Sequence, residues 1–157
     1  MPLEIAFADT RWKRVPNLAK YIQHIHALSL TKPDALKLST LLLANDADVK
    51  ALNRQWRGLN KPTNVLSFPA AAVKVPRGAP KHLGDVILSY ETCAKEAKAA
   101  GKTLRDHAIH LVIHGLLHLV GYDHENDLDA TRMETKEIRI LAKLGIANPY
   151  VLDKGYE

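Results

Sequence analysis

Four short segments of the chain have the hydrophobic pattern of β-strands. In Leu3–Ala8 the large apolar residues occupy every second position, as in a strand with one buried face. The other three, Leu36–Ala44, Val65–Phe68 and Gly84–Ser89, are apolar runs bounded by turn-forming residues. The longest stretch without such a pattern, Ala70–Leu83, is rich in proline and is expected to form a surface loop. We therefore expect a small sheet of roughly four strands.

Further segments have apolar residues spaced three or four positions apart, which is the pattern of helices with one buried side. We expect five helices. The first follows Pro16, the second runs from an N-cap at Asp46 to Arg57 and Gly58, and the third covers Glu91–Ala100. The fourth begins after a capping box at Thr103, and the fifth extends from Glu125–Asp129 to Gly145. The inward-facing residues are expected to be Leu18, Ile22 and Ile25, then Val49, Leu52 and Trp56, and in the last helix Ala130, Met133, Ile138, Leu141 and Leu144.

Strands and helices alternate along the first part of the chain, and helices dominate the second part. This order is typical of an α/β (α+β) fold in which several helices pack against a small sheet. At 157 residues the chain has the length of one ordinary domain, and no linker or internal repeat divides it. We therefore expect a single domain over residues 1–157.

The candidate chemistry lies in one string, His114–His124, at the end of a long apolar run. His114 and His118 are four residues apart, so a helix places both side chains on the same face. Gly121 supplies the left-handed residue that commonly ends a helix, which lets the chain turn back and bring His124 towards the pair. Three neutral imidazoles and one open position form a catalytic zinc site, where the metal activates water. The pattern predicts a metal site on a central helix.

Two other histidines, His107 and His110, precede this string and are rival ligands. One straight helix cannot use His110, His114 and His118 together, because the outer two lie about 12 Å apart at ~1.5 Å rise per residue. Zinc–nitrogen bonds are only about 2.1 Å long. We therefore expect His110 to neighbour the site and His107 to lie at the helix start. A single histidine on an apolar helix is usually a packed core residue, but three in this register are hard to explain by packing.

The same string overlaps the metzincin protease signature, His-Glu-x-x-His-x-x-Gly-x-x-His. All three histidines and the glycine are in register, but Gly115 occupies the position of the glutamate that serves the protease as general base. The sequence therefore has the metal ligands of that signature but lacks the general base that a peptidase needs.

Composition narrows the setting in which this chemistry operates. The 22 Lys and Arg residues exceed the 17 Asp and Glu residues, which gives a net charge of +5, so an anionic partner such as nucleic acid is favoured. The single cysteine, Cys93, excludes an internal disulfide and a thiolate metal cluster, and it suits a reducing cytosol. Neither a signal peptide nor an apolar run of membrane-spanning length is visible. We expect a cytoplasmic protein with no membrane partner.

Three strings together resemble one family. They are His-Gly-Leu-Leu-His-Leu-Val-Gly-Tyr-Asp-His at 114–124, Lys-Pro-Thr-Asn-Val-Leu-Ser-Phe-Pro at 61–69 and Leu-Gly-Asp at 83–85. They are similar to the corresponding strings of the YbeY family, bacterial metal-dependent endoribonucleases that act as ribosomal RNA maturation factors. The resemblance runs through most of the chain and includes Met133, Glu137, Gly145 and Pro149–Tyr150.

The resemblance implies one zinc ion per chain, bound by His114, His118 and His124, and catalytic roles for His114 and Arg57. An arginine suits a phosphodiester substrate because its guanidinium can hold two phosphate oxygens at once. Without the resemblance, Arg57 is better interpreted as a solvated charge at a helix end. Asn64 stands where the family usually has aspartate. A hydrogen-bonding role in the turn tolerates that change, so Asn64 is not assigned to catalysis.

The resemblance thus implies a zinc-dependent, single-strand-specific endoribonuclease, a hydrolase of phosphodiester bonds. The resemblance places it in ribosomal RNA processing (small-subunit rRNA 3′-end maturation) and in ribosome quality control, with ribosomal RNA and small-subunit proteins as partners and no DNA. One alternative is a ribosome-associated binding factor whose zinc is structural or vestigial; a structural site would need a fourth protein ligand. A metallopeptidase is disfavoured by Gly115. Asp123 is expected either to orient a ligand histidine or to cap the turn.

Overall fold

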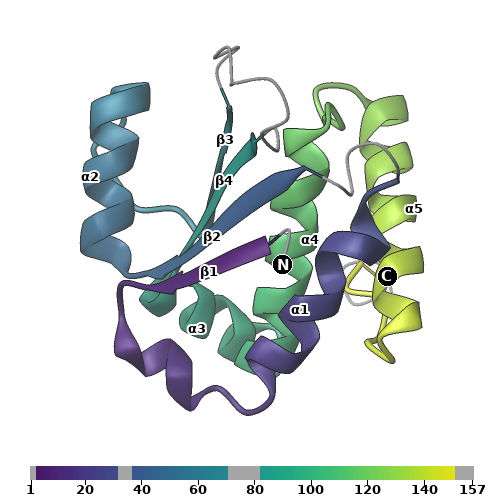
Figure 1. Cartoon of the computed structure of the whole chain (residues 1–157), viewed down its shortest axis with the longest axis horizontal. Helices are drawn as coiled ribbons and strands as arrows, with labels where there is room; N and C mark the ends of the chain where they lie inside the picture. Colours follow the sequence, from purple (N-terminus) through teal and green to yellow (C-terminus); the bar gives the residue numbers. More distant parts are fainter. Residues whose placement is uncertain (1–2, 32–36, 71–81, 151–157) are drawn as a thin grey trace.

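The computed structural model of the chain describes residues 3–31, 37–70 and 82–150 (Figure 1). Its strands are β1 (Leu3–Phe7), β2 (Leu38–Ala44), β3 (Val65–Pro69) and β4 (His82–Ser89). Its helices are α1 (Leu18–Ser29), α2 (Asp46–Arg57), α3 (Tyr90–Ala99), α4 (Leu104–Leu119) and α5 (Asp127–Lys143), with a short 3-10 helix, η1 (Thr10–Arg14). The expected loop at 70–83 falls mostly outside the described residues, and its last two residues begin β4.

The strands form one sheet in the order β1-β2-β4-β3. Strand β2 pairs in parallel with both β1 and β4, whereas β3 pairs antiparallel with β4 and lies at the edge. Parallel neighbours need a long crossover, which α1 supplies between β1 and β2. The inner strands β2 and β4 contain the apolar runs Leu41–Ala44 and Val86–Leu88, which are almost entirely buried because helices cover both faces of the sheet. The predicted α/β class with a four-stranded sheet is confirmed.

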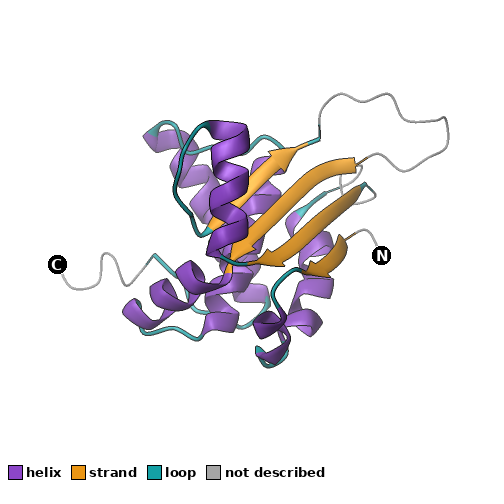
Figure 2. Ribbon diagram, turned by 90° about the vertical axis from the view of Figure 1, so that its left-hand side faces the viewer, coloured by secondary structure: helices purple, strands orange, loops and turns teal. Residues whose placement is uncertain are grey.

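Alternate residues of the sheet belong to two separate hydrophobic cores. Leu41 and Val86 point into the larger core, whereas Leu66 and Ile87 join Val49 of α2 in the smaller one. Helix α2 covers one face of the sheet by itself, and the other four α-helices lie on the opposite face (Figure 1). Figure 2 is seen from the α2 side and shows this helix crossing in front of the strands.

Helix α4 lies at the centre of the larger layer. It packs against α1, α3 and α5 and against strands β3 and β4. Its N-cap is Thr103, as predicted, and the Thr103 hydroxyl accepts a 3.1 Å hydrogen bond from the backbone N–H of Asp106. Because neighbours surround this helix, apolar residues lie on almost all of its sides, and the histidines stand out from that background.

Three local predictions are wrong. Asn45, not Asp46, caps α2, because its side chain accepts from the N–H of Asp48 at 2.9 Å, while Asp46 accepts hydrogen bonds from hydroxyls of the α3 segment. Trp56 is 65% exposed rather than inward-facing. In α5 it is Glu137, one residue before Ile138, that is fully buried. The first error concerns a cap that either residue type can form.

Candidate metal centre

The structure brings His114, His118 and His124 together. One ligand atom from each of the three rings lies within 4.8 Å of the others, so the cluster could hold a metal ion. His114 and His118 come from the last turns of α4, and His124 comes from the loop that follows. The predicted turn is present, since Gly121 has a φ of +100°. No other group of three or more His, Cys, Asp or Glu residues with this property occurs in the part of the chain that the structure describes.

The end of α4 is a Schellman motif, and this motif places a carbonyl against a ligand ring. The N–H of Tyr122 donates to the carbonyl of Leu117 at 3.0 Å, and the N–H of Gly121 donates to that of His118 at 3.1 Å. The Tyr122 carbonyl is thereby held 2.9 Å from Nδ1 of His118. The Asp123 side chain accepts from the N–H of His124 at 2.7 Å. Of the two roles expected for Asp123, the structure therefore shows the hydrogen bond within the turn.

The hydrogen bonds fix which nitrogen of each ring is free. Nδ1 of His118 faces a carbonyl, and Nδ1 of His114 lies 3.0 Å from Oε2 of the Glu137 carboxylate. Both oxygens only accept, so both Nδ1 atoms donate and, in the neutral rings, both Nε2 atoms carry lone pairs. These two Nε2 atoms lie 3.1 Å apart.

Two lone pairs at that separation repel each other unless a cation lies between them. Bonds of about 2.1 Å around a tetrahedral zinc ion place neighbouring ligand nitrogens about 3.4 Å apart, close to the observed distance. Burial lowers the pKa of His118, and the neighbouring His114 and His124 lower it further, which favours the neutral form that binds metals. His124 is exposed, so one side of the cluster is open to solvent. The donor set fits a divalent metal.

Glu137, which the sequence analysis named only as part of the family resemblance, has a role at the site that was not predicted. Its side chain is fully buried and accepts hydrogen bonds from His114, from Nε2 of His110 at 2.5 Å and from the Tyr150 hydroxyl at 2.6 Å. Burial acts to raise the pKa of Glu137, but the hydrogen bonds from His110, His114 and Tyr150 lower it to about 2, so the carboxylate is charged. The sequence signal that could have indicated this role is the position of Glu137, an acidic residue one turn after Met133 on the apolar side of α5.

The rival histidines lie beside the cluster rather than in it. His110 is directed to Glu137 and so contacts the cluster through that carboxylate, which confirms it as a neighbour of the site. His107 lies in the first turn of α4, where its Nε2 is 2.8 Å from Oε1 of Glu96. Asn64, in the turn before β3, donates to the same Glu96 oxygen at 3.0 Å and accepts from the N–H of Val65, a hydrogen-bonding role as expected.

Arg57 belongs to the helix on the other face of the sheet. It ends α2, and its guanidinium donates to the Ser67 carbonyl of edge strand β3 at 3.2 Å and lies 5.5 Å from the Phe68 ring. The Ser67 hydroxyl donates in turn to the carbonyl of Gly115, next to His114, at 3.2 Å. Within the described ranges, Arg57 has no carboxylate partner. Its charge is therefore available to an anion.

Gly115 is required by packing. A Cβ atom at this position would lie 2.7 Å from Cγ1 of Val86 and 3.0 Å from Oγ of Ser67. Contacts under 3.0 Å force a neighbour to move. The space needed for the protease glutamate is therefore filled by strands β3 and β4, which argues against a peptidase more strongly than the sequence alone does.

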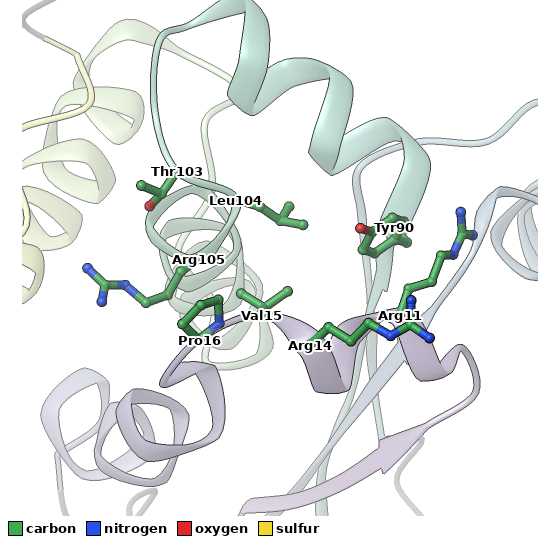
Figure 3. Close-up of a pocket in the computed structure, with 8 residues that line it drawn as sticks. All are labelled: Arg11, Arg14, Val15, Pro16, Tyr90, Thr103, Leu104 and Arg105. Atoms are coloured by element: carbon green, nitrogen blue, oxygen red, sulfur yellow. The ribbon is translucent and has the colours of Figure 1, made fainter.

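A separate cavity of about 350 Å³ lies at the other end of α4 (Figure 3). It is lined by Arg11, Arg14, Val15, Pro16, Tyr90, Thr103, Leu104 and Arg105. Two of its three arginines are already paired: Arg11 with Asp9 and Glu91, and Arg105 with Asp106. Leu104 and His118 are separated by roughly 21 Å of helix at ~1.5 Å per residue. The cavity is therefore distinct from the histidine cluster.

Among the residues that the structure describes, no helix has the length and apolarity required to cross a membrane.

The fold and the cluster define an α/β protein with a three-histidine site suited to a divalent metal. Residues 5–145 match the family model described as Endoribonuclease YbeY. A relative named Endoribonuclease YbeY from a Chelativorans species is 51% identical over 150 residues, covering 94% of this chain and 92% of the relative. The relative of the same name from Ruegeria pomeroyi is 43% identical and covers 98% of this chain and 100% of its own length. The chain belongs to the Endoribonuclease YbeY family.

A solved structure agrees on the fold. The solution structure of TM1509 from Thermotoga maritima superposes with a TM-score of 0.57 at 23% identity and covers 91% of each chain. At this identity the likeness supports the architecture alone.

Proposed function

We propose that the chain is a metal-dependent, single-strand-specific endoribonuclease. The observation that carries the proposal is the histidine cluster, in which the Nε2 atoms of His114 and His118 lie 3.1 Å apart, in a member of a family named for RNA cleavage. The net charge of +5 supports a polyanionic substrate. The chain acts as a single hydrolase domain on phosphodiester bonds.

His114, His118 and His124 would hold one zinc ion, the metal that three imidazoles suit well. When bound, zinc supplies Lewis acidity towards a phosphate oxygen and makes water more acidic. The chain's own residues do the positioning. Glu137 and the Tyr122 carbonyl keep the two α4 rings in the tautomer that presents Nε2.

Arg57 and His114 are the proposed catalytic residues. The extra negative charge that develops on phosphate oxygens during RNA cleavage is stabilised by a guanidinium that reaches them in a forked arrangement. Arg57 is suited to this role because it is exposed, lacks a carboxylate partner in the described chain and is anchored to β3 by only one of its donors. His114 acts as a metal ligand whose orientation Glu137 fixes.

Ribosomal RNA is the proposed substrate, with small-subunit rRNA 3′-end maturation and ribosome quality control as the processes served. A ribosome or its small-subunit proteins are the corresponding partners, and the cytoplasm is the corresponding compartment. The reduced, buried Cys93 is compatible with that location.

The alternative of a binding factor with structural zinc is not favoured. A structural site is closed by a fourth protein ligand, whereas only three histidines gather here among the described residues. Cys93 is buried on α3, and its thiol lies 3.6 Å from the Asn64 carbonyl, which leaves it unsuited as a ligand.

The test combines metal analysis with RNA cleavage for wild type, His118→Ala and Arg57→Ala. Wild type is expected to hold about one zinc ion per chain and to cut a single-stranded RNA but not the same sequence in a duplex. His118→Ala is expected to lose both metal and cleavage. Arg57→Ala should retain the metal but cut on the order of 10²–10³-fold more slowly, as when one transition-state donor is removed.

Two results would contradict the proposal. If the zinc-loaded wild type leaves RNA intact, the site is not a nuclease centre, and the binding role becomes the better interpretation. If Arg57→Ala cuts at the wild-type rate, Arg57 has no part in the reaction even though the metal assignment stands.

A further inference from the structure

Trp56 is a large aromatic side chain left uncovered at the end of α2. Helical periodicity places it on the same side of α2 as the buried residues Val49 and Asn53. Nevertheless 65% of its surface is exposed, so no described element covers it. The other tryptophan of the chain, Trp12, is only 1% exposed and donates its indole N–H to the Ala44 carbonyl. Only the exposed indole is therefore available to a ligand.

The segment after Trp56 is folded back onto the helix and held there. Buried Asn53 makes two hydrogen bonds to it: its carbonyl accepts from the N–H of Leu59 at 3.3 Å, and its side chain donates to the carbonyl of Lys61 at 2.9 Å. Gly58, with a φ of +68°, allows the reversal. Leu59, which is 46% exposed, and Lys61 are thereby held in an ordered loop next to the last turn of α2. The surface is built before any ligand arrives.

The charges of the segment that carries Trp56 all have one sign. Arg57 and Lys61 are exposed, and residues 49–70 contain no aspartate or glutamate. Exposed Leu128, in contrast, lies between Asp127 and Asp129 at the start of α5. A single exposed apolar residue needs no explanation. An exposed indole in a basic segment without acidic residues is the combination found in proteins that bind single-stranded nucleic acid, where bases stack on aromatic rings and cations track the phosphates.

The surface also connects to the histidine cluster. Arg57, adjacent to Trp56, donates to the Ser67 carbonyl, and the Ser67 hydroxyl donates to the carbonyl of Gly115 beside His114. The path from the indole to the cluster therefore crosses a single strand, β3, at the edge of the sheet.

We propose that Trp56, with Leu59 and the nearby cations Arg57 and Lys61, forms a stacking platform for one base of a single-stranded RNA whose backbone continues towards the histidine cluster. This inference rests on the proposed function, since it assigns a substrate contact to the nuclease. The indole supplies the stacking surface, and the cations bind the adjacent phosphates. A duplex has no unstacked base to offer, so the platform also contributes to single-strand preference.

The test measures RNA binding separately from cleavage. The probe is a labelled oligouridylate of roughly 12 nucleotides with 2′-O-methyl riboses and phosphorothioate linkages, chosen to resist cutting by the zinc-loaded protein. Trp56→Ala is expected to raise Kd by about 5- to 150-fold, the range for loss of one base–aromatic stack. Trp56→Phe, which keeps an aromatic face, should recover most of the affinity. Leu128→Ala is the matched control, because it truncates an equally exposed apolar side chain in acidic surroundings.

A second readout reports the contact directly. Acrylamide quenches exposed indoles, so the oligonucleotide is expected to protect wild-type fluorescence, and that protection should disappear in Trp56→Phe, where only buried Trp12 remains. If Trp56→Ala binds the oligonucleotide as tightly as wild type does, the proposal that Trp56 stacks on a base is wrong, and a protein partner becomes the better interpretation of this surface. That result leaves the nuclease proposal intact. Failure of wild type both to bind and to cut RNA overturns the two together.

Discussion

Glu137 links two neighbouring histidines of α4 from the adjacent helix. One of its oxygens accepts from His114, and the other accepts from His110 and Tyr150. A carboxylate behind a ligand imidazole fixes the ring and raises its basicity, so it affects the metal without touching it. The four-residue spacing brings the rings of His114 and His118 together, and Glu137 fixes the orientation of the His114 ring.

Replacing Glu137 by Gln should therefore weaken metal binding. We expect zinc affinity to fall by about 10- to 100-fold, as for loss of a partner behind a ligand histidine, because an amide accepts the His114 hydrogen bond less strongly. Competition with a chromophoric chelator measures the affinity. Glu134→Gln, at a position one turn earlier in α5, is the control and should match wild type. Equal zinc affinities for the two variants would show that Glu137 serves only the packing of α5.

Individual site residues could be predicted from the sequence where their contacts are local. His114, His118 and Gly121 could be assigned because their spacing within one helix and its turn carries the signal. Glu137 could not, because it meets His114 across 23 residues of sequence and a buried acid looks like any other helix residue until α5 is docked. The bond from Ser67 to Gly115 spans 48 residues and was invisible for the same reason.

At the scale of elements, the packing of α4 on the sheet depends on a residue without a side chain. Gly115 is buried against Val86 of β4 and Ser67 of β3, and this contact sets how closely the histidine-bearing helix approaches the strands. In a solvated helix, replacing glycine by alanine stabilises by up to about 1 kcal/mol. Here the methyl group would meet a stiff, β-branched neighbour with no space to yield.

We therefore expect Gly115→Ala to reduce the free energy of unfolding, because an overpacking cost of about 1–3 kcal/mol outweighs the gain in helix propensity. Urea unfolding of the metal-free protein measures the difference. In a Val86→Ala background the methyl group has room, so the same substitution should become neutral or stabilising, and a double-mutant cycle isolates the contact. Destabilisation of the same size in both backgrounds would assign the effect to something other than this contact.

The element-level errors of the sequence analysis have the same origin. Periodicity puts Trp56 on the same side of α2 as the buried residue Val49, but it could not show that no described element covers that end of the helix. In α5 a shift of one position exchanged Ile138 for Glu137, because a pattern of three and four allows two neighbouring stripes. Helix and strand types were predictable from the chain, whereas burial at the ends of elements depended on their neighbours.

At the scale of the molecule, the two halves of the candidate site lie on opposite faces of the sheet. The histidine cluster belongs to the α4 layer, whereas Arg57 belongs to α2. Ser67 of the edge strand β3 links them, because its carbonyl accepts from Arg57 and its hydroxyl donates to the carbonyl of Gly115. An inner strand would have separated them. The strand order is therefore compatible with the proposed roles of Arg57 and the histidine cluster in one site.

Buried histidines give the whole fold a dependence on pH. Burial lowers the pKa of His26, whose Nε2 lies 3.2 Å from the Ser39 hydroxyl, and burial also lowers that of His107 despite Glu96. In the unfolded chain these rings titrate near the ordinary value of 6.5. The unfolded state therefore binds more protons than the folded state once the pH falls below that value.

It follows that stability is fully present above about pH 6.5 and decreases as the pH falls below it, by up to about 1.4 kcal/mol per pH unit for each such histidine. Urea unfolding of metal-free protein between about pH 8 and pH 5 measures the slope. His26→Gln should flatten it, because the variant has one buried imidazole fewer to protonate. His24→Gln, two residues earlier on the exposed side of α1, should leave the slope unchanged. If His26→Gln instead kept the wild-type slope, protonation of His26 would play no part in acid destabilisation.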